Sequence, residues 1–277
     1  LDAERVVVSM GSGAEVVRET AAWLNAQDPK QKVGAMQILL YRPFPVDAFL
    51  AALPASVRSV AVLDRTKEPG APMEPLHADV IGVLAQAVAT GRRASMPRVI
   101  GGRYGLSSKE FTPGMVAAIY AELALPEPRP RFTVGIEDDV TRLSLTFAPS
   151  FRTAAARANF AAVFYGLGSD GTVSANKNSI KIVGEATRLQ AQGYFVYDSK
   201  KAGSSTISHL RFGPRPIKST YLITKANFLA LHQPSLLNLF DFLKNAANDA
   251  TFLMNSPHPA DKVWDTLPAR MQQQILD

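Results

Sequence analysis

A glycine-rich turn in the second half of the chain limits the possible folds more than any other feature of the sequence. Residues 161–165 are apolar and predict a strand, residues 173–191 predict a helix, and residues 193–198 predict a second strand. Gly166, Gly168 and Gly171 lie between the first strand and the helix in the spacing G-x-G-x-x-G. Glycines there let the backbone approach a phosphate, and the amides and dipole of the following helix attract the anion. This unit predicts a nucleotide site, with a tight turn that binds nothing as the alternative.

Polar and cationic residues accompany this turn. Asp198 could serve as the ribose-binding acid of an NAD site, but it follows Gly171 by 27 residues, where about 20 is typical. A lysine pair comes directly after Asp198, which favours a phosphorylated ribose and hence NADP or coenzyme A (CoA). A solvated lysine surface remains the alternative. The other polar residues near the turn are Ser169, Thr172, Asn176 and Lys177.

The first 125 residues alternate between strand and helix patterns. Strands are expected at residues 5–10, 33–40, 57–64 and 97–102, with a helix after Gly13 and further helices at about 46–53, 76–90 and 112–123. The first helix carries the apolar residues Val16, Val17, Ala21 and Leu24. Such alternation predicts a mostly parallel sheet covered on both faces. A proline-rich segment, PEPRP, then suggests a stiff linker.

We therefore expect an α/β protein with two consecutive three-layer domains and mostly parallel sheets, the second Rossmann-like. The expected divisions are a first domain at 1–125, a linker and crossover at 126–154, and a second domain at 155–277. In the second domain we also expect strands at 220–224, 228–231 and 251–253, and helices at 236–247 and 260–267.

The amino-acid composition argues against several classes of functional site and partner. The 277 residues include no cysteine, which excludes disulfides and thiolate ligation of iron–sulfur clusters within this chain. The four histidines are widely spaced, so we expect no metal site. The net charge of +6 is spread without a basic run, which disfavours nucleic acid. No apolar run approaches the roughly 18 to 20 residues of a membrane helix, and no signal-peptide flank is present, so a cytoplasmic location is expected.

Several longer motifs carry a family resemblance. The runs FYGLGSDGTVSANKNSIKIVGE, AQGYFVYDSKKAG and ISHLRFGPRPI resemble the pyruvate:ferredoxin (flavodoxin) oxidoreductase family, as do YRPFP, AVLDRTKEPGAP and VGIEDDVTRLSL in the first half. The resemblance implies a large enzyme that converts pyruvate to acetyl-CoA and CO2 and reduces ferredoxin or flavodoxin. It also implies thiamine diphosphate, Mg and [4Fe-4S] clusters, held by segments outside this chain, and a homodimer of the complete enzyme.

By the same resemblance, the first domain is similar to the transketolase C-terminal domain. The second is similar to the first part of the γ-type domain associated with CoA, so that the chain would stop inside it. No catalytic residue is implied in the chain. The residues implied to bind CoA are Gly168, Ser169, Asp170, Gly171, Thr172, Asn176, Lys177, Tyr197, Lys200 and Lys201. The chain departs from the family's usual residues at Met73, Ser174, Leu231 and the segment 202–205, which puts the loop after Lys201 in doubt.

Other candidate sites are weaker. Asp64, Lys67 and Glu68 could form an acid–base cluster, although a polar loop at a strand end is the simpler interpretation. His77 and His209 are expected to be ordinary structural or surface histidines. A non-catalytic α/β scaffold that makes interdomain or subunit contacts remains a second hypothesis for the whole chain.

Overall fold

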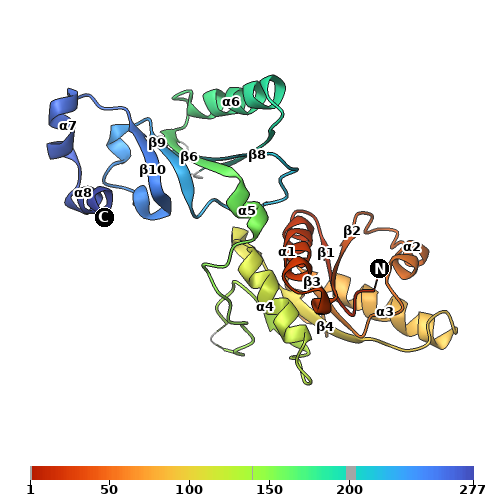
Figure 1. Ribbon diagram of the computed structural model, residues 1–277. Coiled ribbons are helices and arrows are strands. Elements are labelled where there is room, and N and C mark those ends of the chain that lie inside the picture. Colours follow the sequence, from red (N-terminus) through yellow and green to blue (C-terminus); the bar gives the residue numbers. More distant parts are fainter. Residues whose placement is uncertain (1, 139, 198–203) are drawn as a thin grey trace. The chain divides into compact units, whose positions relative to one another are not determined.

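A computed structural model describes residues 2–138, 140–197 and 204–277. Contacts between Cα atoms divide the chain into two compact units. Unit 1 comprises Leu1–Ala156 together with Lys218–Tyr221, and unit 2 comprises Arg157–Ile217 together with Leu222–Asp277. Each unit is built around its own five-stranded sheet (Figure 1).

Unit 1 has a fully parallel sheet in the order β2-β1-β3-β4-β5. Alternate residues of the central strands enter two separate cores, one beneath α1 and α4 and one beneath α2 and α3. The predicted three-layer arrangement is therefore confirmed here. The elements are β1 (Arg5–Met10), α1 (Gly13–Gln27), η1 (Pro29–Gln31), β2 (Val33–Ile38), α2 (Val46–Ala52), β3 (Ser59–Asp64), α3 (Pro75–Ala89), β4 (Arg98–Arg103), η2 (Leu106–Ser108), α4 (Pro113–Leu123) and β5 (Arg131–Thr133).

The stretch 126–154, where we expected a linker and crossover, contributes a strand to this sheet. Strand β5 pairs in parallel with β4, from Gly101 opposite Arg131 to Arg103 opposite Thr133. The short helix α5 (Ala154–Ala158) begins at the end of this stretch. Contacts place residues up to Ala156 in unit 1.

Unit 2 has a mixed sheet in the order β10-β9-β6-β8-β7. Strand β8 lies between β6 and β7 and runs antiparallel to both, whereas β9 is parallel to β6 and β10 is parallel to β9. Four of the five strands thus point the same way, as expected for a mostly parallel sheet. The elements are β6 (Phe160–Leu167), α6 (Thr172–Ala186), β7 (Gln190–Tyr197), β8 (Ser205–Gly213), β9 (Ala226–Leu231), η3 (Pro234–Leu236), η4 (Leu243–Asn245), β10 (Ala246–Met254), α7 (Ala260–Thr266) and α8 (Ala269–Leu276).

Three details of the expected unit 2 were wrong. Strand β8 was not predicted, and residues 220–224, expected as a strand, form none. Residues 236–247 were expected as a helix but form η4 and the start of β10. Their apolar side chains Leu236, Phe242 and Leu243 are buried in the core of unit 2, so burial of a segment that forms no α-helix produced the apolar pattern.

The two faces of the unit 2 sheet are covered by different segments. The odd-numbered residues of β6, such as Val163 and Tyr165, pack with Leu236 and Met271 of η3 and α8. On the opposite face, Thr172 of α6 lies directly over Gly166. The chain therefore leaves β6 toward one face and leaves the neighbouring β9 toward the other. This divergence is the topological switch point at which ligands bind in open α/β sheets.

The segment Lys218–Tyr221, which we call the strap, belongs to unit 1 although it lies between β8 and β9 in sequence. Its Ser219 and Tyr221 hydroxyls donate to the Glu19 carboxylate of α1 at 2.7 and 2.8 Å, and Thr153 donates to the same group. The Thr220 hydroxyl donates to the Ser12 carbonyl at 2.8 Å. Glu19 is only 7% exposed, so one buried carboxylate organises the strap.

Candidate functional site

The glycine turn lies where the β6 strand ends, at one edge of the unit 2 sheet. Gly166 is paired with Thr206 of β8, and Thr206 is paired in turn with Tyr197 of β7. On the other side of β6, Tyr165 is paired with Leu231, so His232 follows next to Gly166. Since strands are about 4.8 Å apart, Tyr197 lies roughly 10 Å across the sheet from Gly166.

Two glycines of the turn are required for different physical reasons. A Cβ atom at Gly166 would lie 2.4 Å from Thr172 Oγ1 and 2.7 Å from Thr172 Cβ. Gly166 therefore gives the first residue of α6 room to lie close to the sheet. Gly171 has open space around it but a φ of +87°, a left-handed conformation that favours glycine.

Asp170 fixes the turn through its side chain. Its carboxylate accepts the Leu167 and Thr172 amides, both at 2.8 Å, and so caps the N-terminus of α6. Burial alone would raise its pKa, but the backbone bonds from Leu167 and Thr172 and a side-chain bond from Thr172 together lower it. The carboxylate therefore already accepts the amide hydrogen bond of Thr172, the first residue of α6. The next two amides of the first turn have no intrahelical acceptor and remain for a ligand.

Replacing Asp170 by Ala should destabilise unit 2 by about 1 kcal/mol, the usual cost of a lost helix cap. Because the folded pKa is lowered, this stabilisation is present at neutral pH and is lost as the pH falls through the folded pKa. Urea unfolding at pH 7, followed by Trp264 fluorescence in a Trp23→Phe background, measures the loss. Asp170→Asn, which keeps one acceptor oxygen, should lose less, and equal stability of all three proteins would contradict the cap.

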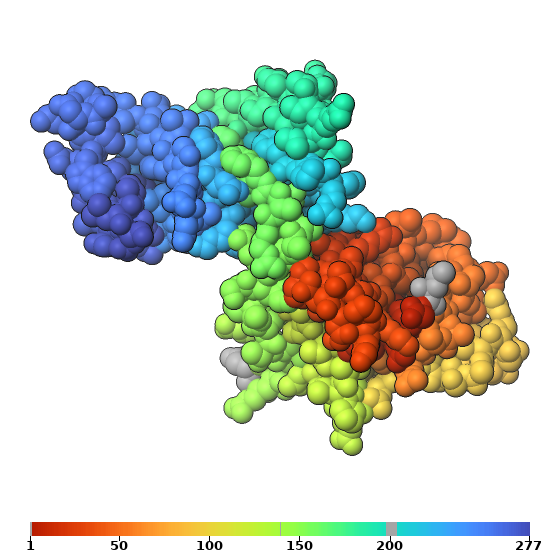
Figure 2. Space-filling model, viewed as in Figure 1, coloured from red at the N-terminus to blue at the C-terminus, as the bar shows by residue number. Residues whose placement is uncertain are grey.

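The residues of the turn and of α6 that are predicted to contact the ligand differ in exposure. Gly168, Ser169 and Gly171 are exposed at the turn. Thr172 and Asn176 are each 2% exposed and face the sheet, and Asn176 Nδ2 has no hydrogen-bond partner among the described residues. Lys177 is exposed, and its ammonium lies 5.5 Å from the Phe195 ring centroid. Helix α6 itself lies at the surface of unit 2 (Figure 2).

The structure brings only part of the predicted set together. Tyr197 is 58% exposed, and by strand alternation it shares a face with Phe195, beneath Lys177. Residues 168–172, Lys177 and Tyr197 thus share one sheet edge and one face. Lys200 and Lys201 lie outside the described residues, so their predicted role stays a prediction.

His232 was missed by the sequence reasoning and lies beside the glycine turn. Its Nδ1 atom is 2.8 Å from Thr172 Oγ1, and its backbone amide donates to the Tyr165 carbonyl at 2.9 Å. Asn255, which follows β10, donates from Nδ2 to the His232 carbonyl at 3.2 Å. The sequence carried a signal for this position. His232 comes directly after the expected strand 228–231, just as the lysine pair comes directly after the expected strand 193–198.

The weaker candidates form no acid–base cluster. Asp64 is buried and caps α3 by accepting the Leu76 and His77 amides, and burial raises its pKa despite these bonds. Lys67 and Glu68 are exposed in the loop that follows.

Both buried histidines fit structural roles. His77 is buried, which lowers its pKa, and it lies against Gly101 in unit 1. His209 accepts the Ile223 amide at 3.2 Å, and burial, followed by the charge of Arg211, lowers its pKa to about 4.

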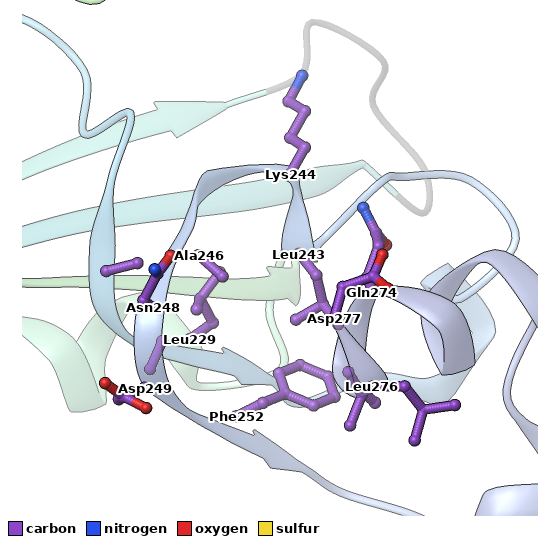
Figure 3. Close-up of a pocket in the computed structure, with 13 residues that line it drawn as sticks. Leu229, Leu243, Lys244, Ala246, Asn248, Asp249, Phe252, Gln274, Leu276 and Asp277 are labelled. Carbon is purple, nitrogen blue, oxygen red and sulfur yellow. The ribbon is translucent and has the colours of Figure 1, made fainter.

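A large pocket lies elsewhere in unit 2, between the edge strand β10 and helix α8. It has a volume of about 930 Å³, and Figure 3 shows Leu243, Phe252 and Leu276 gathered in it while Lys244 points away. Its lining residues on β9 and β10 are Leu229, residues 246–250 and Phe252. None of the predicted binding residues lines it.

Within residues 2–138, 140–197 and 204–277, no group of three or more His, Asp or Glu side chains is arranged to hold a metal ion. None of the helices in the same ranges is long and apolar enough to cross a membrane.

Comparison with known proteins covers both units. Residues 3–106 match the family described as pyruvate:ferredoxin oxidoreductase core domain II, and residues 161–276 match pyruvate ferredoxin/flavodoxin oxidoreductase. The chain is 61% identical over 277 residues to a pyruvate-flavodoxin oxidoreductase of Rhodospirillum rubrum, covering 99% of the chain and 23% of the relative.

Two further relatives match over nearly the whole chain. A pyruvate:ferredoxin oxidoreductase of Moorella thermoacetica is 51% identical, with 99% of the chain and 23% of the relative covered. A pyruvate dehydrogenase [NADP(+)] of Cryptosporidium parvum is 43% identical, with 99% and 14% covered. The chain thus spans about a quarter or less of the length of these relatives. With most of its residues in the two family matches, the chain belongs to the pyruvate:ferredoxin/flavodoxin oxidoreductase family and is a part of a larger enzyme.

Proposed function

We propose that this chain is the CoA-binding part of an enzyme that oxidatively decarboxylates pyruvate. In that reaction the acetyl group passes to the CoA thiol, CO2 leaves, and the electrons reduce ferredoxin or flavodoxin. Names of the relatives support the reaction class. The observation that supports CoA binding is the exposed glycine turn at the switch point of unit 2, with Lys177 and Tyr197 on the same sheet edge and face.

The chemistry of this edge suits a polyphosphate. The first-turn amides of α6 and the positive end of its dipole attract an anion. The Lys177 ammonium adds a charge that forms charge-assisted hydrogen bonds with phosphate oxygens. Tyr197 presents an exposed ring on which an adenine or pantetheine arm can pack. In this proposal the chain binds and orients the acyl acceptor.

The redox chemistry belongs to other parts of the enzyme. With no cysteine, the chain has no thiolate that could bind an iron–sulfur cluster. Thiamine diphosphate, Mg and the clusters are proposed for the remaining domains. Those domains, ferredoxin or flavodoxin, and a second copy of the enzyme are the proposed partners, in the cytoplasm and without nucleic acid or membrane.

Replacing Lys200 and Lys201 together by Ala should weaken CoA binding more than tenfold, about 1.4 kcal/mol. The reason is that each lysine–phosphate contact contributes roughly 1 to 3 kcal/mol. Isothermal titration calorimetry of the 277-residue chain with CoA measures the change. A matched control is Lys181→Ala, which removes an exposed lysine one turn beyond Lys177 on α6. Unchanged affinity in the double variant would rule out this role for the pair.

Two other functions make different predictions. An NADP site would bind NADP more tightly than CoA, and the name of the Cryptosporidium parvum relative makes this comparison worthwhile. A non-catalytic scaffold would bind neither. Melting temperatures of the chain with CoA, NAD and NADP separate the three, since only a ligand that binds the folded state raises the melting temperature. A rise with CoA alone is the expected result.

A further inference from the structure

His232 occupies the switch point of unit 2 itself. Strands β6 and β9 are parallel neighbours, paired from Ala162 opposite Phe228 to Tyr165 opposite Leu231. From there the chain continues into α6 on one face of the sheet and into η3 on the other. His232 is the first residue after β9 and therefore lies where the two connections separate, at the opening in which ligands of such folds bind.

His232 is held by bonds to three different segments, one through its ring and two through its backbone. Thr172 of α6 contacts Nδ1 at 2.8 Å, Tyr165 of β6 accepts the backbone amide, and Asn255 after β10 donates to the carbonyl. The ring also lies edge-on to Phe164, with 6.0 Å between centroids. Such anchoring fixes both the position and the orientation of the ring. A fixed ring loses little freedom when a ligand binds, which favours a binding role.

The Thr172 contact occupies one ring nitrogen of His232. Thr172 is 2% exposed, and its hydroxyl lies over Gly166, where it contacts Nδ1 at 2.8 Å and also bonds to the Asp170 carboxylate. Nε2 has no partner within residues 2–138, 140–197 and 204–277, and it is not among the fully buried unpaired atoms. Nε2 is therefore the ring nitrogen left for a ligand beside the glycine turn, and it donates a hydrogen bond when it carries a proton.

We propose that His232 donates its Nε2–H to a phosphate oxygen of the ligand held at the glycine turn, while Thr172 occupies Nδ1. This inference rests on the proposed function, because it takes the CoA phosphates as that ligand. Asp170 lies close enough for its charge to interact with the ring, but its carboxylate already accepts the Leu167 and Thr172 amides and a bond from the Thr172 side chain. The His232 donor therefore faces the ligand while the nearby negative charge is directed into the turn.

Two substitutions separate the two nitrogens of the ring. His232→Gln places a side-chain amide near the Nε2 position, whereas His232→Asn places one near Nδ1 and leaves the Nε2 position empty. We expect the Gln variant to bind CoA within about threefold of the unmodified chain. The Asn variant should bind at least tenfold more weakly while keeping its contact with Thr172. Calorimetric titration of the 277-residue chain with CoA measures both, and melting temperatures show that each variant is folded.

The order of the two variants decides the question. If His232 only ties α6 to β9 through Nδ1, the Asn variant will bind CoA normally and the Gln variant will bind weakly, which overturns the inference. Equal affinity of both variants and the unmodified chain also overturns it while leaving the proposed function intact. Failure of the unmodified chain to bind CoA overturns the proposed function first and this inference with it.

Discussion

Replacing Gly166 by Ala is expected to destabilise unit 2 by about 2 kcal/mol and to weaken CoA binding at least tenfold. A Cβ atom there would lie 2.4 Å from Thr172 Oγ1, 2.7 Å from Thr172 Cβ and 2.8 Å from Asp170 Oδ2. Because the Cβ contact involves an atom next to the backbone, rotation of a side chain does not relieve it, and α6 must move away from the sheet. Overpacking of this kind costs about 1 to 3 kcal/mol. Urea unfolding and CoA titration of the same protein measure the two losses.

A second glycine on the same helix provides the control. Gly184 has open space where a Cβ would be placed and lies inside α6. Gly184→Ala should therefore stabilise the helix by up to about 1 kcal/mol and leave CoA affinity unchanged. The two substitutions are chemically identical and opposite in expected sign. If Gly166→Ala kept both its stability and its affinity, the close approach of α6 to the sheet would not be needed for the site.

The arrangement of unit 1 could be predicted because its local signals agree with its fold. Strands β1 and β3 carry runs of β-branched or apolar residues that are buried in the sheet, and the helices between the strands show their own periodicity. Pro113 begins α4, as its position after Thr112 indicates. Strand β5 could not be predicted, since its three residues carry no pattern and form a strand only through pairing with β4.

Unit 2 was harder because its tertiary contacts override local patterns. Strand β8 contains His209 and Arg211, two polar residues that are buried on a central strand, so the usual apolar alternation is hidden. Gln190 and Ala191 extend the helical pattern of α6, but they form the start of β7 instead. Antiparallel pairing on both sides of β8 depends on partners far away in sequence, and no local signal specifies it.

In the candidate site, too, the features that are contiguous in sequence could be predicted, whereas contacts between residues far apart in sequence could not. The turn, its glycines and the start of α6 are contiguous in sequence, so the motif predicts them together. Asn176 was assigned to the ligand because it lies one turn into the helix, yet the helix turns it toward the sheet. His232 lies 60 residues after Thr172 in sequence, and only the pairing of β9 with β6 brings the two within hydrogen-bond distance.

The strap of unit 1 leads to the second large effect. Replacing Glu19 by Ala should destabilise unit 1 by about 3 kcal/mol, since hydrogen bonds to a carboxylate contribute roughly 1.5 to 3 kcal/mol each and do not add fully. The change also leaves the buried hydroxyls of Thr153 and Ser219 without this acceptor. Trp23 lies one turn after Glu19 on α1, so its fluorescence in a Trp264→Phe background reports urea unfolding of unit 1.

Loss of the carboxylate should also release the strap before unit 1 unfolds. Lys218 is exposed, and trypsin should cleave after it faster in the Glu19→Ala variant, because the Ser219 and Tyr221 bonds that hold the adjoining backbone are absent. Glu15→Ala is the matched control. Glu15 lies one turn earlier on α1, and among the residues that the structure describes its side chain pairs only with Arg18, in a surface ion pair of about 0.5 kcal/mol or less. If both variants showed the same stability and cleavage rate, Glu19 would not be what holds the strap. A protected Lys218 in a destabilised Glu19→Ala protein would show that the strap is held chiefly by its other contacts, such as the bond from the Thr220 hydroxyl to the Ser12 carbonyl.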